Sequence, residues 1–232
     1  MRGPFKLQAL DVIKTRGIPV GTILDVGVLE GTPELKKIFP DKMHVLFEPV
    51  REFHEKIADN YRSAGIQFDI VGAAVADCDG EVDLQVVGKF GEMEISHSFM
   101  VLDADSKEDK STRRVKRVSL DSFLSDKSYD WPYLLKIDID GHDELVLNGA
   151  KETLKKTSVI IIEATAKNIA KRIEMCLEAG FRVFDLCEPC YYDGVFWQCD
   201  IIAIRQELYR DLFLQMGGGR VVADKYQIFV GS

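Results

Sequence analysis

The sequence predicts an α/β fold built on a parallel β-sheet. Short, almost continuously apolar runs recur along the chain at 22–26, 44–47, 134–139 and 158–162. Such runs are typical of strands that are buried on both faces. Most of these runs end in an acid or a glycine, and residues at helical spacing follow them, which is the order of βαβ units. With 232 residues, the chain suits one domain with a three-layer core.

The composition argues against polyanionic partners and membranes. The formal net charge is -8 at pH 7, whereas contacts to phosphates or to an anionic membrane surface need a basic face. The basic run 107–117 is interpreted as a solvated loop, with a local cationic patch as the alternative. No apolar run reaches the roughly 20 residues of a membrane span, and the N-terminus lacks a signal-peptide core. We therefore expect no nucleic acid and no membrane as partner.

The five cysteines favour a reducing compartment, because their number is odd and their spacing is irregular. Three of them, Cys187, Cys190 and Cys199, lie near one another in sequence. A structural zinc site needs a fourth ligand, and no histidine is nearby. We expect ordinary thiols and a cytoplasmic protein.

The chain is expected to form a single domain, 1–232, with an N-terminal helix at about 4–16, a core at about 22–205 and a C-terminal extension at 206–232. Further strands are expected at 66–76, 81–87, 158–163, 181–186 and 200–205, and helices at 52–64 and 166–179. The aromatic residues between the last two strands are expected in a loop. A late apolar run, 226–230, is interpreted as an extra strand or a homodimer contact.

The segment 88–116 has no strong period and is rich in Gly, Ser, Asp and Lys. A loop of this length in a compact domain is usually functional or mobile. It is expected to form a lid or part of the pocket for an acceptor substrate. Ser96, His97 and Ser98 are the candidate contacts to that acceptor. A surface histidine is the alternative for His97.

The run TILDVGVLEG (22–31) has the pattern of a cofactor loop. A strand followed by a glycine loop and a helix lets a ligand approach the backbone closely and points amide N–H groups at it. The dinucleotide pattern G-x-G-x-x-G fails, since no glycine stands two positions after Gly27. The spacing resembles the first motif of S-adenosylmethionine-dependent methyltransferases, in which the loop wraps the methionine and ribose part of the cofactor. Asp25, Gly27, Val28 and Gly31 are therefore candidate cofactor contacts, and a plain strand-to-helix turn is the alternative.

Two later strand ends supply further candidates. Glu48 and Pro49 end the next strand about 20 residues after the glycine loop, where an acid usually holds a ribose hydroxyl pair. A carboxylate has two acceptor oxygens and takes both hydroxyl donors. Ala73, Ala74 and Asp77 end the third strand, where small side chains leave room for an adenine ring.

The most informative run is YLLKIDIDGHDELVLNGA (133–150). A buried strand ends in acids and a glycine, and an amphipathic helix begins near Asp143. The charged residues and the histidine gather at the carboxyl end of the strand, the edge where ligands bind in open α/β sheets. These candidates are Lys136, Asp138, Asp140 and His142.

Together these motifs resemble the FkbM family of S-adenosylmethionine-dependent methyltransferases, over about 22–205. The parts are LDVGVLEG, HVLFEPV, VGAAVAD, VKRVSLDSFL and, most specifically, LLKIDIDGHDELVLNGA followed by VIIIEA. The family usually has glutamates where Asp140 and Asp143 stand, and often an Asn within the glycine loop that this chain lacks. The resemblance implies a Rossmann-like class I methyltransferase fold, a doubly wound, mostly parallel seven-stranded sheet with the last strand antiparallel and helices on both faces. It also implies S-adenosylmethionine as cofactor and a hydroxylated small molecule, such as a sugar or secondary metabolite, as acceptor.

Methylation of a hydroxyl needs a group that removes its proton, or a metal. Asp138 would face the methyl end of the cofactor, and His142 suits the base because imidazole exchanges protons near neutral pH. Asp140 would orient His142 or, with Asp138 and Glu163, bind a divalent metal such as magnesium. Capping of the following helix is the plain alternative for these acids.

Lys136 is unusual on an apolar strand, because a buried lysine without a partner is costly. A pair with Asp138 or Glu163 that holds the site in shape is as good an interpretation as a catalytic role.

Three rival functions remain open. A binding module that kept the fold without activity is the first. An N-methyltransferase of nucleic acid or protein is disfavoured by the acidic charge and by the sequence at 138–141, which lacks the Asn/Asp-Pro-Pro-aromatic tetrad. A nicotinamide-dependent oxidoreductase is disfavoured by the glycine spacing.

Overall fold

The computed structural model describes residues 2–88, 95–101, 112–139, 141–214, 225 and 228–229, with the backbone alone at 87–88 and 95–101. The chain divides into two compact units. The core unit is Val20–Thr157, and the terminal unit is Met1–Pro19 with Ser158–Ser232. The expectation of one domain stays a prediction.

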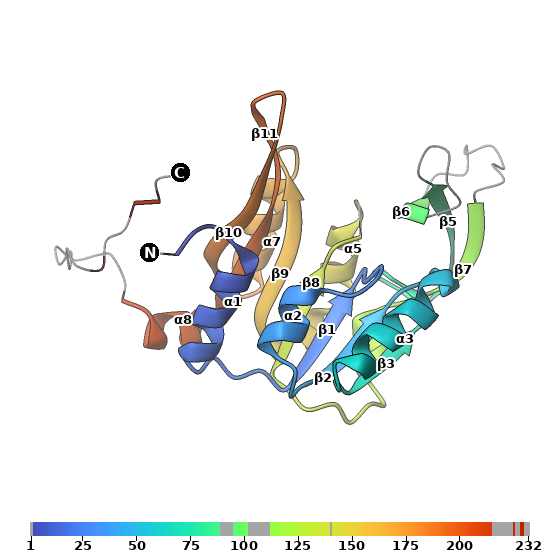
Figure 1. Cartoon of the computed structure of the whole chain (residues 1–232), viewed down its shortest axis with the longest axis horizontal. Coiled ribbons are helices and arrows are strands. Elements are labelled where there is room, and N and C mark those ends of the chain that lie inside the picture. The colour runs from blue at the N-terminus through green and yellow to red at the C-terminus, as the bar shows by residue number, and fades with distance from the viewer. Residues whose placement is uncertain are drawn as a thin grey trace. The chain divides into compact units, whose positions relative to one another are not determined.

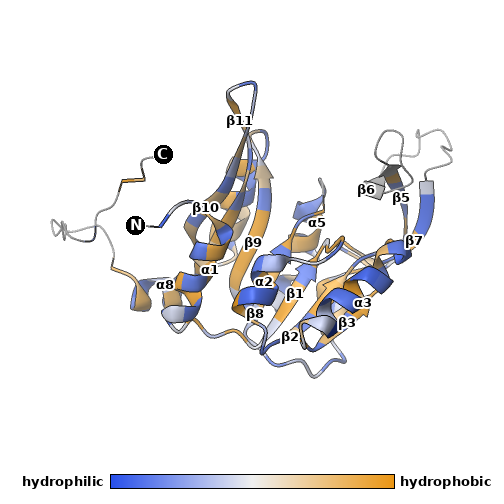
Figure 2. Ribbon diagram, in the orientation of Figure 1, coloured by the Kyte–Doolittle hydropathy of each residue, from blue (hydrophilic) through white to orange (hydrophobic). Residues whose placement is uncertain are grey.

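Four parallel strands in the order β8-β1-β2-β3 carry the core unit. Their bounds are β1 Thr22–Val26, β2 Met43–Phe47, β3 Phe68–Val71 and β8 Tyr133–Ile137. Every residue of β1 and β8 is buried, and Figure 2 colours both strands mainly as hydrophobic. The continuous apolar runs therefore correspond to strands covered on both faces, as their pattern predicts.

A second sheet in the core unit has the order β4-β7-β5-β6. Its strands are β4 Ala74–Val75, β5 Gly80–Gly88, β6 Ile95–Val101 and β7 Thr112–Val118. The single third strand expected at 66–76 is thus wrong, because it breaks after Val71 and resumes as β4 beside β7. The long loop expected at 88–116 is also wrong in part, since β6 and β7 pair with β5 over cross-strand contacts that no short-range pattern encodes. The side chains of Ser96, His97 and Ser98 lie outside the described part.

Short helices connect these strands. They are α2 Pro33–Ile38, the 3-10 turn η1 Arg51–Phe53, α3 His54–Ser63, α4 Leu120–Leu124, α5 Asp143–Asn148 and α6 Lys151–Lys155. Pro33 begins α2 and Ser119 caps α4 by accepting a bond from the Ser122 N–H, as helix-start chemistry predicts. The amphipathic run after β8 is two helices, because α5 ends at Asn148 and α6 begins at Lys151. Asp121 caps α6 by accepting the backbone N–H groups of Glu152 and Thr153.

The terminal unit pairs β9, β11 and β10 in that order, and both pairings of β11 are antiparallel. Its elements are α1 Lys6–Thr15, β9 Thr157–Thr165, α7 Ile169–Glu178, β10 Phe181–Tyr192, β11 Val195–Arg205 and α8 Gln206–Leu212. The aromatic loop expected between the last strands is wrong: β10 and β11 form one long hairpin (Figure 1). Its turn is Asp193–Gly194, with φ of 50° and 77°. The dipeptide Asp-Gly is a strong hairpin signal that the sequence-based prediction missed.

The structure confirms the predicted class, an α/β fold whose main sheet has seven strands and is mostly parallel. The last strand, β11, is antiparallel to its neighbours, as expected. The five cysteines are free. None of the helices in the described residues has the length and apolar character to cross a membrane. The run 226–230 lies almost wholly outside the described residues, so a dimer contact there stays a prediction, as does a cytoplasmic location.

Candidate methyl-transfer site

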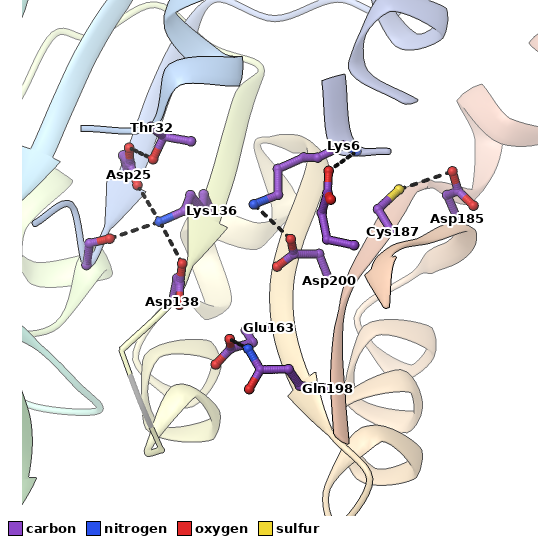
Figure 3. Close-up of polar contacts among 12 residues, drawn as sticks. Lys6, Asp25, Thr32, Lys136, Asp138, Glu163, Asp185, Cys187, Gln198 and Asp200 are labelled. Carbon is purple, nitrogen blue, oxygen red and sulfur yellow. Dashed lines mark hydrogen bonds and ion pairs between the residues drawn. The ribbon is translucent and has the colours of Figure 1, made fainter. Parts of the chain in front are cut away.

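The site is organised by a buried lysine between two neighbouring strands. β1 and β8 pair in a register that sets Asp25 beside Lys136. The Lys136 Nζ lies 3.1 Å from Asp25 Oδ1 and 3.3 Å from Asp138 Oδ2, and it donates a hydrogen bond of 2.9 Å to the Gly27 carbonyl (Figure 3). One N–H of the ammonium is used by the Gly27 carbonyl, and the two carboxylates form ion pairs with its charge. Of the two partners expected for Lys136, Asp138 is observed, and Asp25 is a partner that the sequence did not indicate.

The positive charge of Lys136 is stabilised by its two carboxylate neighbours. Burial alone lowers the pKa of a lysine, because it disfavours the ammonium. Asp25 and Asp138 outweigh burial here, and the pKa of Lys136 lies above its ordinary value. Lys136 therefore stays protonated at neutral pH, which suits a positioning group rather than a base.

The loop after β1 approaches β8 too closely for any residue but glycine at position 27. Gly27 has a φ of +82°, and a Cβ placed there would lie 1.8 Å from the Asp138 carbonyl oxygen. Thr32, at the other end of the loop, donates its hydroxyl to Asp25 Oδ2 at 2.7 Å. Asp25 is fully buried. It therefore holds the loop at both ends, through Thr32 and through Lys136.

Glu48 holds the same loop from the end of β2. Its two oxygens accept the backbone N–H groups of Leu29 and Val50, each at 2.9 Å, and the residue is 2% exposed. Leu29 has a positive φ of 50°. Burial raises the pKa of Glu48, while the backbone hydrogen bonds act in the opposite direction. The Val28 backbone also interacts with this carboxylate, so of its roughly four lone-pair directions about one is left for a hydroxyl donor. Pro49 follows directly and lines a cavity beside η1.

The segment expected to contact adenine is fixed by a second close approach. Ala73 and Ala74 are buried, and Asp77 is exposed. A Cβ at Gly149 would lie 2.2 Å from the Ala76 carbonyl oxygen and 2.9 Å from the Asp77 Cα. The C-terminal end of α5 therefore packs directly on the backbone of this turn.

Besides Lys136, three catalytic candidates are predicted at the end of β8. Asp138 follows β8, and its side chain is 38% exposed. In the described part of the chain, Lys136 contacts its Oδ2 and nothing hydrogen-bonds its Oδ1. His142 is half-buried at the N-cap of α5, without a side-chain capping bond. Asp140 lies outside the described residues.

The described residues offer no fit for a metal. No group of three His, Cys, Asp or Glu that could hold an ion occurs among them. Glu163 belongs to the terminal unit, where it accepts a hydrogen bond of 2.5 Å from Gln198 (Figure 3).

Sequence reasoning missed three residues of the site. Thr32 stands at the N-cap position of α2, so its sequence context predicts an ordinary helix cap and not the observed hydrogen bond to Asp25. Leu29 contributes only its N–H, and any residue has one. Gly149 is visible as part of the Leu-x-Gly-Ala motif, yet the segment that it contacts is more than 70 residues away in sequence.

The structure has the class I methyltransferase arrangement at one edge of its parallel sheet. A glycine loop follows β1, and an acid follows each of β2 and β8. The family model for the methyltransferase FkbM domain matches residues 25–183. The chain belongs to this family of S-adenosylmethionine-dependent methyltransferases, as the sequence motifs predicted.

Solved structures with similar folds are methyltransferases of several kinds. An rRNA methylase from Streptococcus thermophilus is 9% identical, with 88% of this chain and 98% of that chain covered and a TM-score of 0.51. The METTL16 MTase domain is 11% identical, with 86% and 65% covered and a TM-score of 0.50. The precorrin-6y C5,15-methyltransferase from Geobacter metallireducens GS-15 is 11% identical, with 85% and 87% covered and a TM-score of 0.46. At these identities the likeness to the first two structures concerns the fold alone. No protein with a curated description matches the sequence.

Proposed function

We propose that this chain is an O-methyltransferase that uses S-adenosylmethionine to methylate a hydroxyl of a small molecule, such as a sugar or a secondary metabolite. The observation that supports this most is the position of Asp138. Its carbonyl oxygen adjoins Gly27 of the cofactor loop, and its carboxylate keeps one oxygen without a partner among the described residues. The hydroxyl of an acceptor thus has a hydrogen-bond partner that can orient it directly beside the loop.

The residues fit the cofactor. Glu48 has a lone-pair direction left for a ribose hydroxyl, and the strand–glycine loop–helix arrangement lets a ligand approach the backbone N–H groups. Ala73, Ala74 and Asp77 are the proposed adenine contacts. Asp25 acts through the loop, since it is fully buried behind it.

When bound, S-adenosylmethionine supplies an electrophilic methyl group on sulfur. The protein has to orient the acceptor oxygen in line with that methyl and receive the hydroxyl proton. Asp138 is the proposed acceptor-orienting group, and His142 is the proposed base. Lys136 fixes Asp138 and the glycine loop relative to each other, so its proposed role is positioning.

Cofactor binding is tested by calorimetry with S-adenosylmethionine. Gly27→Ala should weaken binding at least about tenfold, because its Cβ collides with the Asp138 backbone. Gly17→Ala is the matched control: it has a φ of +74°, but no atom lies within 4 Å of its Cβ, so affinity should stay within about twofold. Equal affinity for both variants would contradict the proposed loop.

Activity is tested with labelled cofactor and a panel of hydroxylated sugars and metabolites. His142→Ala should lower turnover about 10²-fold or more while the cofactor affinity changes little. Full turnover in this variant would remove His142 as the base. Cofactor binding without methylation of any acceptor would favour the rival function of a non-catalytic binding module. Methyl transfer to a base nitrogen of RNA would contradict the proposed O-methyltransferase activity.

A further inference from the structure

One histidine of the core unit stands between the proposed ribose and adenine contacts. His54 begins α3, which packs against β3 (Figure 1). Its Nε2 lies 2.7 Å from the Glu48 carbonyl oxygen. A carbonyl oxygen accepts hydrogen bonds and has none to donate, so the Nε2–H of His54 is the donor of this bond. The helix after β2 thus holds the main chain of the proposed ribose acid.

This imidazole takes the place of a missing backbone donor. β2 and β3 are parallel, with Phe47 opposite Val71, and the Glu48 N–H donates to the Val71 carbonyl. In a parallel ladder the next bond would run from the Ala73 N–H to the Glu48 carbonyl. The Ala73 N–H instead folds back onto the Val71 carbonyl at 2.9 Å. Glu48 is 2% exposed, so its carbonyl needs another donor, and His54 supplies it.

The same ring lies against the turn that leads to the proposed adenine contacts. A Cβ at Gly72 would lie 3.2 Å from His54 Cε1, and apart from the chain neighbours no other described residue has an atom within 4 Å of that position. Gly72 directly precedes Ala73 and Ala74, which are both buried. The imidazole therefore meets both chain segments at the point where the sheet ends, Glu48 after β2 and Gly72 after β3.

The backbone position of Glu48 matters because its carboxylate has little freedom left. The N–H groups of Leu29 and Val50 each donate to one of its oxygens, and the Val28 backbone interacts with it as well. About one lone-pair direction remains for a ribose hydroxyl. A shift of the main chain at Glu48 would turn this direction away from the hydroxyl.

We propose that His54 is a positioning residue of the cofactor site, which holds the ribose acid and the adenine turn in place relative to each other. It acts through Glu48 and Gly72 and takes no part in the methyl-transfer step. Its substitution should therefore weaken binding of the adenosine half of the cofactor. This inference rests on the proposed function, because it takes Glu48 and the turn at Ala73 and Ala74 as cofactor contacts.

Calorimetry on the full chain tests this role with S-adenosylmethionine and with methylthioadenosine, which keeps the ribose and adenine but lacks the amino-acid part. His54→Phe keeps an aromatic ring without the donor and should weaken both ligands about tenfold. His54→Gln keeps an N–H donor and should bind both within about threefold of the wild type. Glu55→Gln, at the exposed next position of α3, is the control and should leave both affinities unchanged.

The possible results separate the inference from the proposed function. Equal affinity of the wild type and His54→Phe, or no recovery in His54→Gln, would overturn the inference. Weaker binding of S-adenosylmethionine alone would also overturn it, because the effect would then lie outside the adenosine half. His54→Ala, which removes the donor without adding bulk, replaces His54→Phe if the larger ring prevents folding. A wild type that binds neither ligand would count against the proposed function itself.

Kinetics with a methyl acceptor distinguish positioning from chemistry. In His54→Phe the KM for the cofactor should rise about tenfold, while kcat at saturating cofactor should stay within about twofold of the wild type. A fall in kcat with an unchanged KM would assign His54 to the chemical step and overturn the positioning role.

Discussion

At the scale of residues, the site depends on one buried ammonium and the groups around it. Lys136 is 5% exposed at its side chain and Asp25 is 0% exposed, so neither charge is solvated by water. A buried pair adds little net stability relative to an apolar pair, but removing one partner leaves an uncompensated charge. The same contact fixes the Gly27 carbonyl and Asp138, which links stability to the geometry of the site.

Lys136→Met should lower the free energy of unfolding by about 3–5 kcal/mol, because Asp25 then lies buried without its cation. Combining it with Asp25→Asn should recover a large part of the loss, since no buried charge remains. Urea unfolding measures both. Lys155→Met is the control, because its pair with Glu152 is exposed, and it should change stability by no more than about 0.5 kcal/mol. A loss below about 1 kcal/mol for Lys136→Met would rule out this account.

At the scale of elements, α5 and the turn at Ala76–Asp77 meet in a direct backbone contact at Gly149, beside the packing of Leu145 on the apolar cluster that contains Ala76. Gly149 ends α5 and has an ordinary negative φ of -88°, so a side chain there is opposed by lack of space alone. The Leu-x-Gly-Ala motif thus has a physical reason: the glycine lets the helix after β8 meet the segment after β4.

Gly149→Ala should destabilise the chain by about 1–3 kcal/mol, the usual cost of overpacking, because its Cβ falls 2.2 Å from the Ala76 carbonyl. It should also weaken S-adenosylmethionine binding, since the proposed adenine segment must move. Asn148→Ala, one residue earlier and exposed, should leave stability within about 0.5 kcal/mol. Thermal unfolding and calorimetry on both variants measure these effects, and identical behaviour of the two would refute the packing argument.

At the scale of the whole molecule, buried titratable groups make stability depend on pH. His44 lies on β2, fully buried, and its Nε2 is 3.0 Å from the Phe39 carbonyl oxygen. Burial lowers the pKa of His44 below its ordinary 6.5, and that hydrogen bond only partly offsets the effect. Below about pH 6.5 the unfolded chain therefore binds more protons at this histidine than the folded chain does. Stability from this group is present above that pH and is lost as the pH falls.

We expect the wild type to lose more stability than His44→Gln between pH 6.5 and 5.5, by up to about 1 kcal/mol, on the scale of about 1.4 kcal/mol per pH unit for one proton. The pKa of Glu48 is raised, so that group acts in the opposite direction. Both proteins keep Glu48, and the difference between their unfolding curves isolates His44. Parallel curves would show that His44 is not the group responsible.

Short-range patterns in the sequence suffice for the fold class, for the residue types at the ends of the parallel strands and for the family. Buried parallel strands need continuous apolar runs, and a glycine or an acid at a strand end is visible in a short window. Asp25, Gly27, Glu48 and Asp138 are therefore recognisable at strand ends from the sequence alone.

Tertiary packing determines which of these residues touch. Lys136 contacts Asp25 because β1 and β8 align in register, although more than 100 residues separate them in sequence. The close approach of Gly149 to Ala76 and the pairing of β7 with β5 depend in the same way on distant segments. Local patterns encode burial and turns, whereas partners across a sheet are selected by packing, register and the pairing of buried charges.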